Sequence, residues 1–373
     1  MISKENRIVF EDMWEKIHSK ALRTSRTSFG KIPYTTYNGK YDDMSNLPAA
    51  WTNGFWPALL LLIYSKTHEE QFLLAARKAC DILDNALLDF FSLNHDVGFM
   101  WNISSGADYR LTGNEKQLNR LMLAAGYMMS RYNCEGEFLR AWNGENEVGW
   151  TIIDTMMNLP VLYRASEVTK DDRFKFVAIR HADKTMKYHV RDNGACRHIV
   201  EYDPSNGKYI KTHAGQGYNE TSCWARGQSW GIYGFALSHR FTGKQEYIDT
   251  SMLIADYFIE HMNNRNGMVP CDFEQPESPA IYDSSAAACA ACGMLELASF
   301  LESDKAEKYE KYAKEIVIKL FNDFFCHDAS EDSMLRFGTE AYYRGIHKSL
   351  IYGDYFFTEA VLRILGHDTE FIW

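Results

Sequence analysis

Five short polar turns, each lying between two helical patterns, most constrain what this chain can fold into. The turns lie at 66–69, 111–114, 168–171, 241–244 and 302–305, and each contains a Thr or Ser that can cap the following helix. Apolar residues recur at helical spacing on both sides of every turn. The repeat therefore predicts antiparallel helix pairs rather than an alternation of strands and helices.

Working outward from these turns gives twelve helices in six pairs. The expected inner helices, richer in Trp, Gly, Ala and Met, are 51–66, 96–111, 149–167, 223–241, 283–301 and 350–366, and the expected outer helices are 5–24, 69–88, 114–131, 171–190, 244–262 and 306–323. An open solenoid would need polar capping repeats at both ends, whereas the last helix is strongly aromatic. We therefore expect an all-α fold, an (α/α)6 barrel of six helical hairpins, forming a single domain over residues 1–373.

The net charge, the apolar runs and the cysteines of the chain exclude some classes of protein. The formal net charge of −10 argues against nonspecific binding to nucleic acid. No apolar run approaches the ~20 residues of a membrane span, and the N-terminus lacks a signal peptide, so we expect a cytoplasmic protein. The eight scattered cysteines are then expected as reduced thiols, with Cys289 and Cys292 as packing residues. The sequence makes no prediction of oligomeric state.

Asp154 stands out because it lies inside an apolar segment that the pattern assigns to a buried helix. Burying an ionised carboxylate costs several kcal/mol unless the group is paired, hydrogen-bonded or protonated. Such a carboxyl tends to have a raised pKa, which suits a general acid. A hydrogen bond to a neighbouring helix is the alternative role.

Other unusual residues fall at the starts of the inner helices or in the long loops that feed them, so a closed ring would gather them at one mouth. Asp96 could be a helix cap or a second carboxyl for acid/base work. Arg226 could pair with a substrate carboxylate or form an inter-helix salt bridge. Several tryptophans beside carboxylates are typical of sugar-stacking platforms. His198 and His213 lack zinc-ligand spacing, and we expect no metal.

Six segments, in order along the chain, carry a resemblance to a known family. They are Trp51-Thr-Asn-Gly-Phe-Trp56, His95-Asp-Val-Gly-Phe99, Ile153-Asp-Thr-Met-Met-Asn-Leu-Pro160, Gly215-Gln-Gly-Tyr218, Trp224-Ala-Arg-Gly-Gln-Ser-Trp-Gly-Ile-Tyr-Gly234 and Ser349-Leu-Ile-Tyr-Gly-Asp-Tyr-Phe356. With these segments the chain resembles the unsaturated glucuronyl hydrolases, glycoside hydrolase family 88. Relatives that act on unsaturated rhamnogalacturonan match these segments less well.

The resemblance implies roles for ten residues. Asp154 would be the acid/base and Asp96 the second essential aspartate. The residues that would bind substrate are His95, His198, Gln216, Arg226 and Trp230 around the uronate, Trp51 and Trp142 along the cleft, and Tyr343 towards the leaving sugar. Family members differ in the loop 342–349 according to their preference for sulfated substrates, and this loop leaves that preference open.

The implied substrate is a small unsaturated oligosaccharide made by a polysaccharide lyase, such as a chondroitin, hyaluronan or heparin disaccharide. Protonation of its C4=C5 vinyl ether at C4, followed by addition of water at C5, would release the 4,5-unsaturated glucuronic acid without any cofactor. Two alternatives remain at this point. One is an unsaturated rhamnogalacturonyl hydrolase, and the other is a non-catalytic helical ring that binds sugars or proteins.

Overall fold

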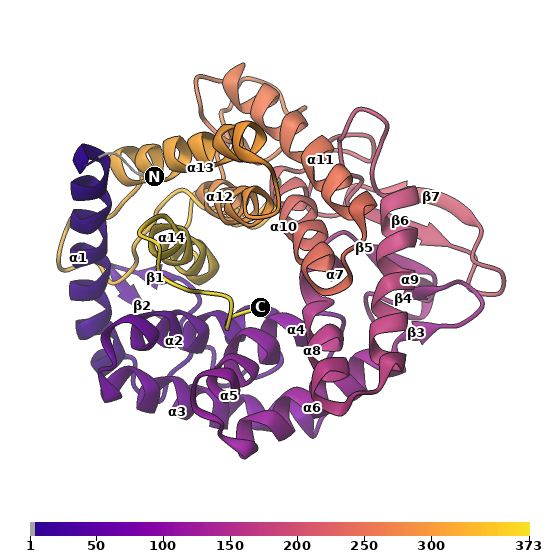
Figure 1. The fold of residues 1–373 in the computed structure, drawn as a ribbon, viewed down its shortest axis with the longest axis horizontal. Coiled ribbons are helices and arrows are strands. Elements are labelled where there is room, and N and C mark those ends of the chain that lie inside the picture. The colour runs from indigo at the N-terminus through magenta and orange to yellow at the C-terminus, as the bar shows by residue number, and fades with distance from the viewer. Residues whose placement is uncertain (1–3) are drawn as a thin grey trace.

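The structure, a computed structural model, describes residues 4–373 and consists of two concentric rings of helices (Figure 1). The inner ring comprises α2 (Phe55–Thr67), α4 (Val97–Trp101) continued by a π-helix (Asn102–Gly106) and α5 (Ala107–Thr112), α7 (Thr155–Asn158) with α8 (Pro160–Thr169), α10 (Ala225–Thr242), α12 (Ser284–Ala298) and α14 (Ile351–Ile364). The outer ring comprises α1 (Lys4–Thr27), α3 (Glu70–Leu87), α6 (Glu115–Ser130), α9 (Asp172–Tyr188), α11 (Gln245–Asn263) and α13 (Ser303–Asp323). The predicted (α/α)6 barrel is confirmed.

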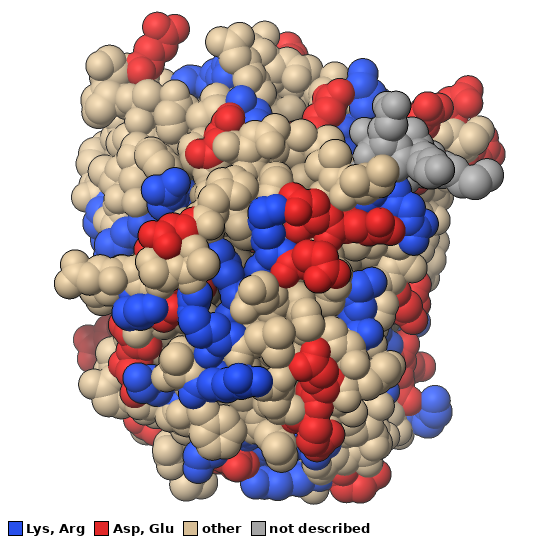
Figure 2. Space-filling view, turned by 90° about the vertical axis from the view of Figure 1, so that its left-hand side faces the viewer, with Lys and Arg blue, Asp and Glu red and all other residues tan. Residues whose placement is uncertain are grey.

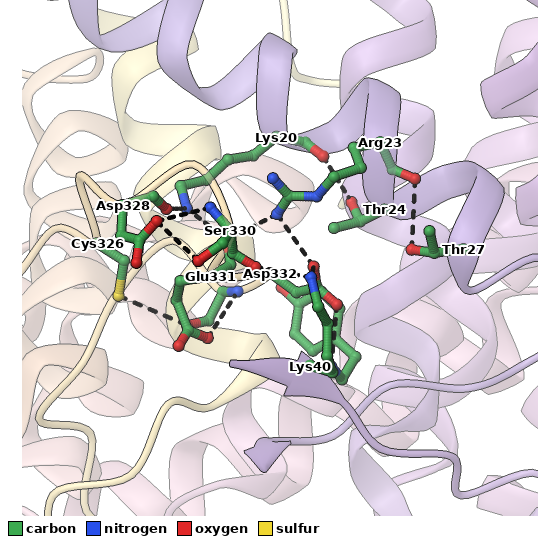
Figure 3. Close-up of polar contacts among 12 residues, drawn as sticks. Lys20, Arg23, Thr24, Thr27, Lys40, Cys326, Asp328, Ser330, Glu331 and Asp332 are labelled. Carbon is green, nitrogen blue, oxygen red and sulfur yellow. Dashed lines mark hydrogen bonds and ion pairs between the residues drawn. The ribbon is translucent and has the colours of Figure 1, made fainter. Parts of the chain in front are cut away.

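The ring closes between its last and first elements. Helix α14 packs against both α2 and α12, so no inner helix face is left at an open end. Outside this seam, α1 is fastened to the connection that precedes α14 (Figure 3). Lys20 Nζ donates to the carbonyl oxygens of Asp328 and Glu331, at 2.9 and 2.6 Å, and Arg23 Nη2 lies 3.0 Å from Asp332 Oδ1. These contacts tie the two ends of the barrel sequence together.

Small side chains let the inner helices approach one another closely. Helix α12 is built mainly from Ala, Ser, Cys and Gly, and it packs tightly against α10. Its two cysteines, Cys289 and Cys292, are fully buried free thiols, as the sequence predicted for packing residues. A Cβ atom added at Gly234 of α10 would lie 2.5 Å from Met156 Cβ, so that position requires glycine.

The predicted start of the third inner helix is wrong. Trp150–Ile152 forms strand β5, which pairs with β6 (Ile199–Tyr202), and β6 pairs in turn with β7 (Tyr209–His213), all antiparallel. β-Branched and aromatic residues suit a strand once a partner is available, and β6 supplies it. Asp154 therefore lies in the turn between β5 and α7, not within a helix.

The predicted capping by the repeated Thr residues is also wrong. Thr67, Thr169 and Thr242 end their own helices, where each Oγ1 donates to the carbonyl four residues before. The N-cap side chains of the following helices α6 and α9 come instead from Asn114 and Asp171. The turns were placed correctly, but Thr closes the first helix rather than opening the second.

Short hairpins complete the fold: β1 (Thr36–Tyr37) with β2 (Lys40–Tyr41), and β3 (Tyr132–Asn133) with β4 (Phe138–Leu139). Figure 2 shows the face that carries α1, where Lys and Arg side chains are interspersed with Asp and Glu. Among the described residues of that face, basic and acidic side chains are mixed, unlike the continuous basic surface typical of nucleic-acid-binding proteins. Within residues 4–373, no helix has the length and apolarity needed to cross a membrane.

Candidate active site

A cavity of about 570 Å³ opens at the end of the barrel where the long connections lie. Its walls come from the starts of the inner helices, from the β5–β6 sheet and from two loops. The lining residues are Trp51, Asn94, His95, Asp96, Trp142, Ile152, Asp154, His198, Ile199, Gly215, Gln216, Ala341, Tyr343 and Arg344. The structure thus brings together eight of the ten residues predicted for the site.

The two aspartates reach the cavity in the same way. Asp96 precedes α4 and Asp154 precedes α7, so each occupies the N-cap position of a short helix, yet neither side chain caps that helix. Asp283, by contrast, accepts hydrogen bonds from the backbone of α12 in the usual manner. The predicted alternative role of Asp96 as a helix cap is therefore wrong. Both carboxyl groups instead line the cavity, where the two residues are 7% and 9% exposed.

Asn158 connects the segments that carry these two aspartates. Its Oδ1 accepts the backbone N–H of Phe99 at 2.7 Å. Its Nδ2 lies 3.4 Å from Asp96 Oδ1 and donates to the backbone carbonyl of Asp154 at 3.2 Å. Since Asn158 is fully buried, this one side chain fixes the spacing of α4 against α7, and with it the spacing of the carboxyl pair.

A histidine stands beside each aspartate. His95 Nε2 lies 3.5 Å from Asp96 Oδ2, and His198 Nε2 lies 3.5 Å from Asp154 Oδ1. His198 Nδ1 lies 3.0 Å from the backbone nitrogen of Gln216 and 3.1 Å from the backbone carbonyl oxygen of Ala214, so the 214–216 loop holds this ring in place. Within residues 4–373, His198 Nε2 and Asp154 Oδ1 are buried atoms without a hydrogen-bond partner. Both are therefore available to a ligand.

Burial sets the protonation of this site. Desolvation, followed by the nearby negative charge of Asp154, raises the pKa of Asp96 well above its usual range. Burial also lowers the pKa of His95 to about 3, which keeps that imidazole neutral at physiological pH. The site thus combines a neutral histidine with a carboxyl group that favours its protonated form.

Arg226 and Trp230 are not among the residues that line the cavity. The guanidinium of Arg226 pairs with Asp283 Oδ2 at 2.5 Å, which is the inter-helix salt bridge that the sequence left open. It also donates to the backbone carbonyls of Thr339 and Glu340, at 2.6 and 2.7 Å. Arg226 therefore holds the loop that brings Tyr343 to the cavity, rather than presenting a free guanidinium there.

Aromatic side chains form the walls and the layer beneath them. Trp51 packs against Tyr352 with ring centroids 5.1 Å apart, and Trp142 lies edge-on to His95 at 5.8 Å. Trp230 is fully buried and packs against Phe99 at 5.2 Å. Trp51 and Trp142 therefore offer fixed ring faces and edges to a ligand, and Trp230 supports the floor.

Sequence reasoning missed two features of the cavity. Arg344, next to the predicted Tyr343, is the one Lys or Arg among the described residues that line it. Its position directly after the aromatic residue of that loop was the sequence signal that could have identified it. Gly215 has a φ of +58°, and a Cβ atom there would lie 2.3 Å from His198 Nδ1. Only glycine allows the loop to pack against that histidine.

Potential metal ligands do not gather in the described part of the chain. Among residues 4–373, no group of three or more His, Cys, Asp or Glu side chains is placed to hold a metal ion.

Comparison with known proteins places this geometry in a family. Residues 26–241 match the model of glycosyl hydrolase family 88. The chain is 34% identical to the unsaturated glucuronyl hydrolase of Bacillus sp. strain GL1, over 94% of this chain and 97% of that protein. It is 31% identical to the unsaturated chondroitin disaccharide hydrolase of Streptococcus agalactiae, over 91% of this chain and 86% of that protein.

Solved structures give the same result. The crystal structure of the Bacillus sp. GL1 unsaturated glucuronyl hydrolase superposes with a TM-score of 0.91 at 31% identity, over 95% of this chain and 96% of that chain. A heparin-specific unsaturated glucuronyl hydrolase superposes with a TM-score of 0.87 at 28% identity, over 95% of this chain and 96% of that chain. The protein is a glycosidase and belongs to glycosyl hydrolase family 88.

Proposed function

We propose that the protein removes the 4,5-unsaturated glucuronic acid residue from the non-reducing end of lyase-generated glycosaminoglycan oligosaccharides. The observation that carries this proposal is the pair Asp96 and Asp154, which face a tryptophan-walled cavity with unsatisfied polar atoms at its base. The names of the relatives support it, since they include unsaturated glucuronyl and chondroitin disaccharide hydrolases. Because Asp96 and Asp154 are only 7% and 9% exposed, a sugar that reaches them must enter a recess, and the site suits removal of one terminal residue at a time.

The reaction adds water across the C4=C5 bond. The carboxyl of Asp154 gives its proton to C4, the π electrons form the new C–H bond, and the ring oxygen stabilises the positive charge left on C5. The resulting carboxylate then takes a proton from water as the water oxygen bonds to C5, which restores the acid. The hemiketal opens to a ketone at C5, and the hemiacetal left at C1 collapses to an aldehyde and expels the leaving sugar.

The neighbouring groups prepare this proton transfer. A bound uronate carries its own negative charge, which disfavours ionised carboxylates around it and so favours a protonated acid. We propose that His198 Nε2, 3.5 Å from Asp154 Oδ1, moves into hydrogen-bond distance of that carboxyl when the substrate binds, and that Asp96 is the neighbouring carboxyl that favours a proton. The carboxylate that Asp154 becomes as it gives up its proton stabilises the positive charge that develops at C5.

Some of the predicted binding residues would contact the substrate directly, and others would hold those residues in position. We propose that His95, His198 and Gln216 contact the uronate, that Trp51 and Trp142 line the path of the sugar rings, and that Tyr343 faces the leaving sugar. Arg226 and Trp230 position these groups through the loop 339–344 and the floor. We propose further that the enzyme acts in the cytoplasm on small oligosaccharides, without a metal or redox cofactor.

The test is loss of the ultraviolet absorbance of the unsaturated uronate on incubation with unsaturated chondroitin, hyaluronan and heparin disaccharides. A rhamnose-linked unsaturated substrate in parallel distinguishes an unsaturated rhamnogalacturonyl hydrolase. The proposal predicts turnover of at least one glycosaminoglycan disaccharide and a slower reaction with the rhamnose-linked one. Binding of these sugars without any turnover would support a non-catalytic ring instead.

A further inference from the structure

The segment 369–373 follows α14 and enters the ring from the end at which the inner helices finish. In Figure 1 this yellow segment leads from α14 towards the middle of the ring, where the mark C stands. We propose that Trp373 is a positioning residue for the reaction, because its indole supports from below the floor that carries Asp96 and Trp51. This role rests on the proposed function and extends it to a side chain that lies outside the cavity.

Trp373 is fully buried among aromatic rings from three inner helices. Its ring centroid lies 6.3 Å from that of Phe99 in α4 and 5.4 Å from that of Tyr233 in α10. It also stacks on Phe356 of α14, with centroids 6.4 Å apart and an interplanar angle of 7°. Aromatic pairs at these separations attract one another beyond the burial of their area. One side chain therefore touches alternate helices of the ring and fixes how far each lies from the axis.

Phe99 extends this contact from Trp373 to the active site. Its ring centroid lies 5.7 Å from that of Trp51, which lines the cavity. Its backbone N–H is held by Asn158, the residue that spaces the two aspartates. Phe99 also lies in α4, the short helix that Asp96 directly precedes. A shift of Phe99 towards an empty space beneath it would therefore move both Trp51 and Asp96.

The segment that carries Trp373 is fastened to the inner ring on both sides. Arg164 Nε, from α8, donates to the backbone oxygen of Trp373 at 2.8 Å. Arg110 Nη2, from α5, donates to the backbone oxygen of Ile372 at 2.9 Å. The indole N–H of Trp373 lies 3.3 Å from Oε1 of Glu359, a fully buried side chain of α14. A substitution that removes only the indole therefore leaves both arginine anchors in place.

Removal of the indole should leave a void that the surrounding side chains fill only in part. Phe99 borders this void and can move into it, which would draw α4 away from the position that places Asp96 in the cavity. Added indole can refill the void, because apolar cavities left by a deleted side chain bind small aromatic molecules. The N–H group of the added indole can then meet Glu359, as the Trp373 side chain does.

The experiment measures kcat/KM for an unsaturated chondroitin disaccharide, with and without added indole. Trp373→Ala should lower kcat/KM at least about tenfold, because small displacements of catalytic groups are costly. Saturating indole should restore most of this loss and leave the wild type unchanged. Trp373→Phe, which keeps a ring against Phe99, should stay within about twofold of the wild type.

Trp14→Ala is the matched control, because Trp14 is a buried tryptophan of α1 in the outer ring, where it stacks on His18. This variant should lower the Tm, as Trp373→Ala should, but it should leave kcat/KM of the folded enzyme within about twofold of the wild type. If Trp373→Ala does not fold, Trp373→Leu takes its place, since leucine keeps an apolar side chain at the position and removes the ring.

Fluorine NMR of protein labelled with fluorotryptophan gives a readout that needs no turnover. The Trp51 resonance, assigned with Trp51→Phe, should shift in Trp373→Ala or Trp373→Leu and return when indole is added to the alanine variant. Trp14→Ala should leave this resonance in place. The measurement therefore separates displacement of the cavity wall from a general loss of stability.

Unchanged kcat/KM, or an unmoved Trp51 resonance, in a folded Trp373→Ala or Trp373→Leu variant would overturn the proposed role of Trp373. So would a loss of activity that indole leaves in place while it restores the Tm. If the wild type leaves the disaccharide unchanged, the proposed function fails, and the Trp51 resonance alone decides whether Trp373 supports the site.

Discussion

Replacing Asp96 by Asn should stabilise the fold while it abolishes activity, and the gain in stability should grow with pH. The Asp96 side chain is buried, and desolvation raises its pKa well above the ordinary value of 3.8. A carboxyl group with a raised folded-state pKa contributes its stability below the unfolded value and loses it as pH rises towards the folded value. An asparagine has the same shape, still accepts the hydrogen bond from Asn158, and carries no such pH dependence.

The magnitude follows from proton linkage. Above 3.8 and below its folded-state pKa, a single such group lowers the free energy of unfolding by about 1.4 kcal/mol for each pH unit. For each pH unit within that range the advantage of the variant should therefore grow by about 1.4 kcal/mol. With an unfolding entropy of about 2.1 cal/mol/K per residue over this chain, the difference in Tm should grow by about 2 °C for each pH unit.

The assay is calorimetric or fluorimetric melting of the wild type and Asp96→Asn at half-unit steps from pH 5 to 8. Asp183→Asn, a partly exposed carboxyl paired with Lys244 on the outer ring, is a control for removal of an acidic charge. A difference in Tm between wild type and Asp96→Asn that stays constant across this range would refute the reasoning. So would a difference that shrinks as pH rises.

Three further predictions follow from the contacts around the site. Asn158→Ala should lower kcat far more than it raises KM and should cost about 1–3 kcal/mol of stability, because it leaves the Phe99 N–H unpaired; unchanged kcat would show that Asn158 does not position the aspartates. Arg226→Ala leaves Asp283 buried and unpaired, so chemical denaturation should show a loss of about 3–5 kcal/mol; unchanged stability with a raised KM would instead favour direct contact with substrate. His95 has a pKa of about 3 in the folded protein, so the stability that its neutral form contributes should be lost as pH falls below 6.5, by about 3 kcal/mol at pH 4. In denaturant titrations, His95→Gln should reduce this fall in the free energy of unfolding between pH 6.5 and 4. An unchanged fall in the variant would show that His95 is not its source.

The helices were predictable because their signals are local. The Ala-rich pattern of α12, for example, is buried on all sides, and its position was predicted within a few residues at each end. The positions of Trp51, Asp96 and Asp154 at one mouth followed from ring closure, since each lies near the start of an inner helix. The repeat therefore predicted both the barrel architecture and the end of the barrel at which the site lies.

Other features depend on contacts between distant segments. The apolar pattern of Trp150–Ile152 fits a buried helix and a buried strand equally well. The segment forms a strand because it pairs with Ile199–Glu201. Likewise, the sequence of the segment Trp224–Trp230 does not show how far each side chain lies from the mouth of the barrel. It therefore could not distinguish an Arg226 guanidinium that lines the cavity from one that pairs with Asp283 beneath it.

The central claim is that Asp154 starts the hydration of an unsaturated uronate. The most direct test is the initial rate of absorbance loss with an unsaturated chondroitin disaccharide, measured together with release of the second sugar, for wild type and Asp154→Asn. The wild type should lose absorbance and release sugar at equal rates, and a folded Asp154→Asn variant should do neither. Sugar release while the chromophore stays intact, or full activity of Asp154→Asn, would contradict it.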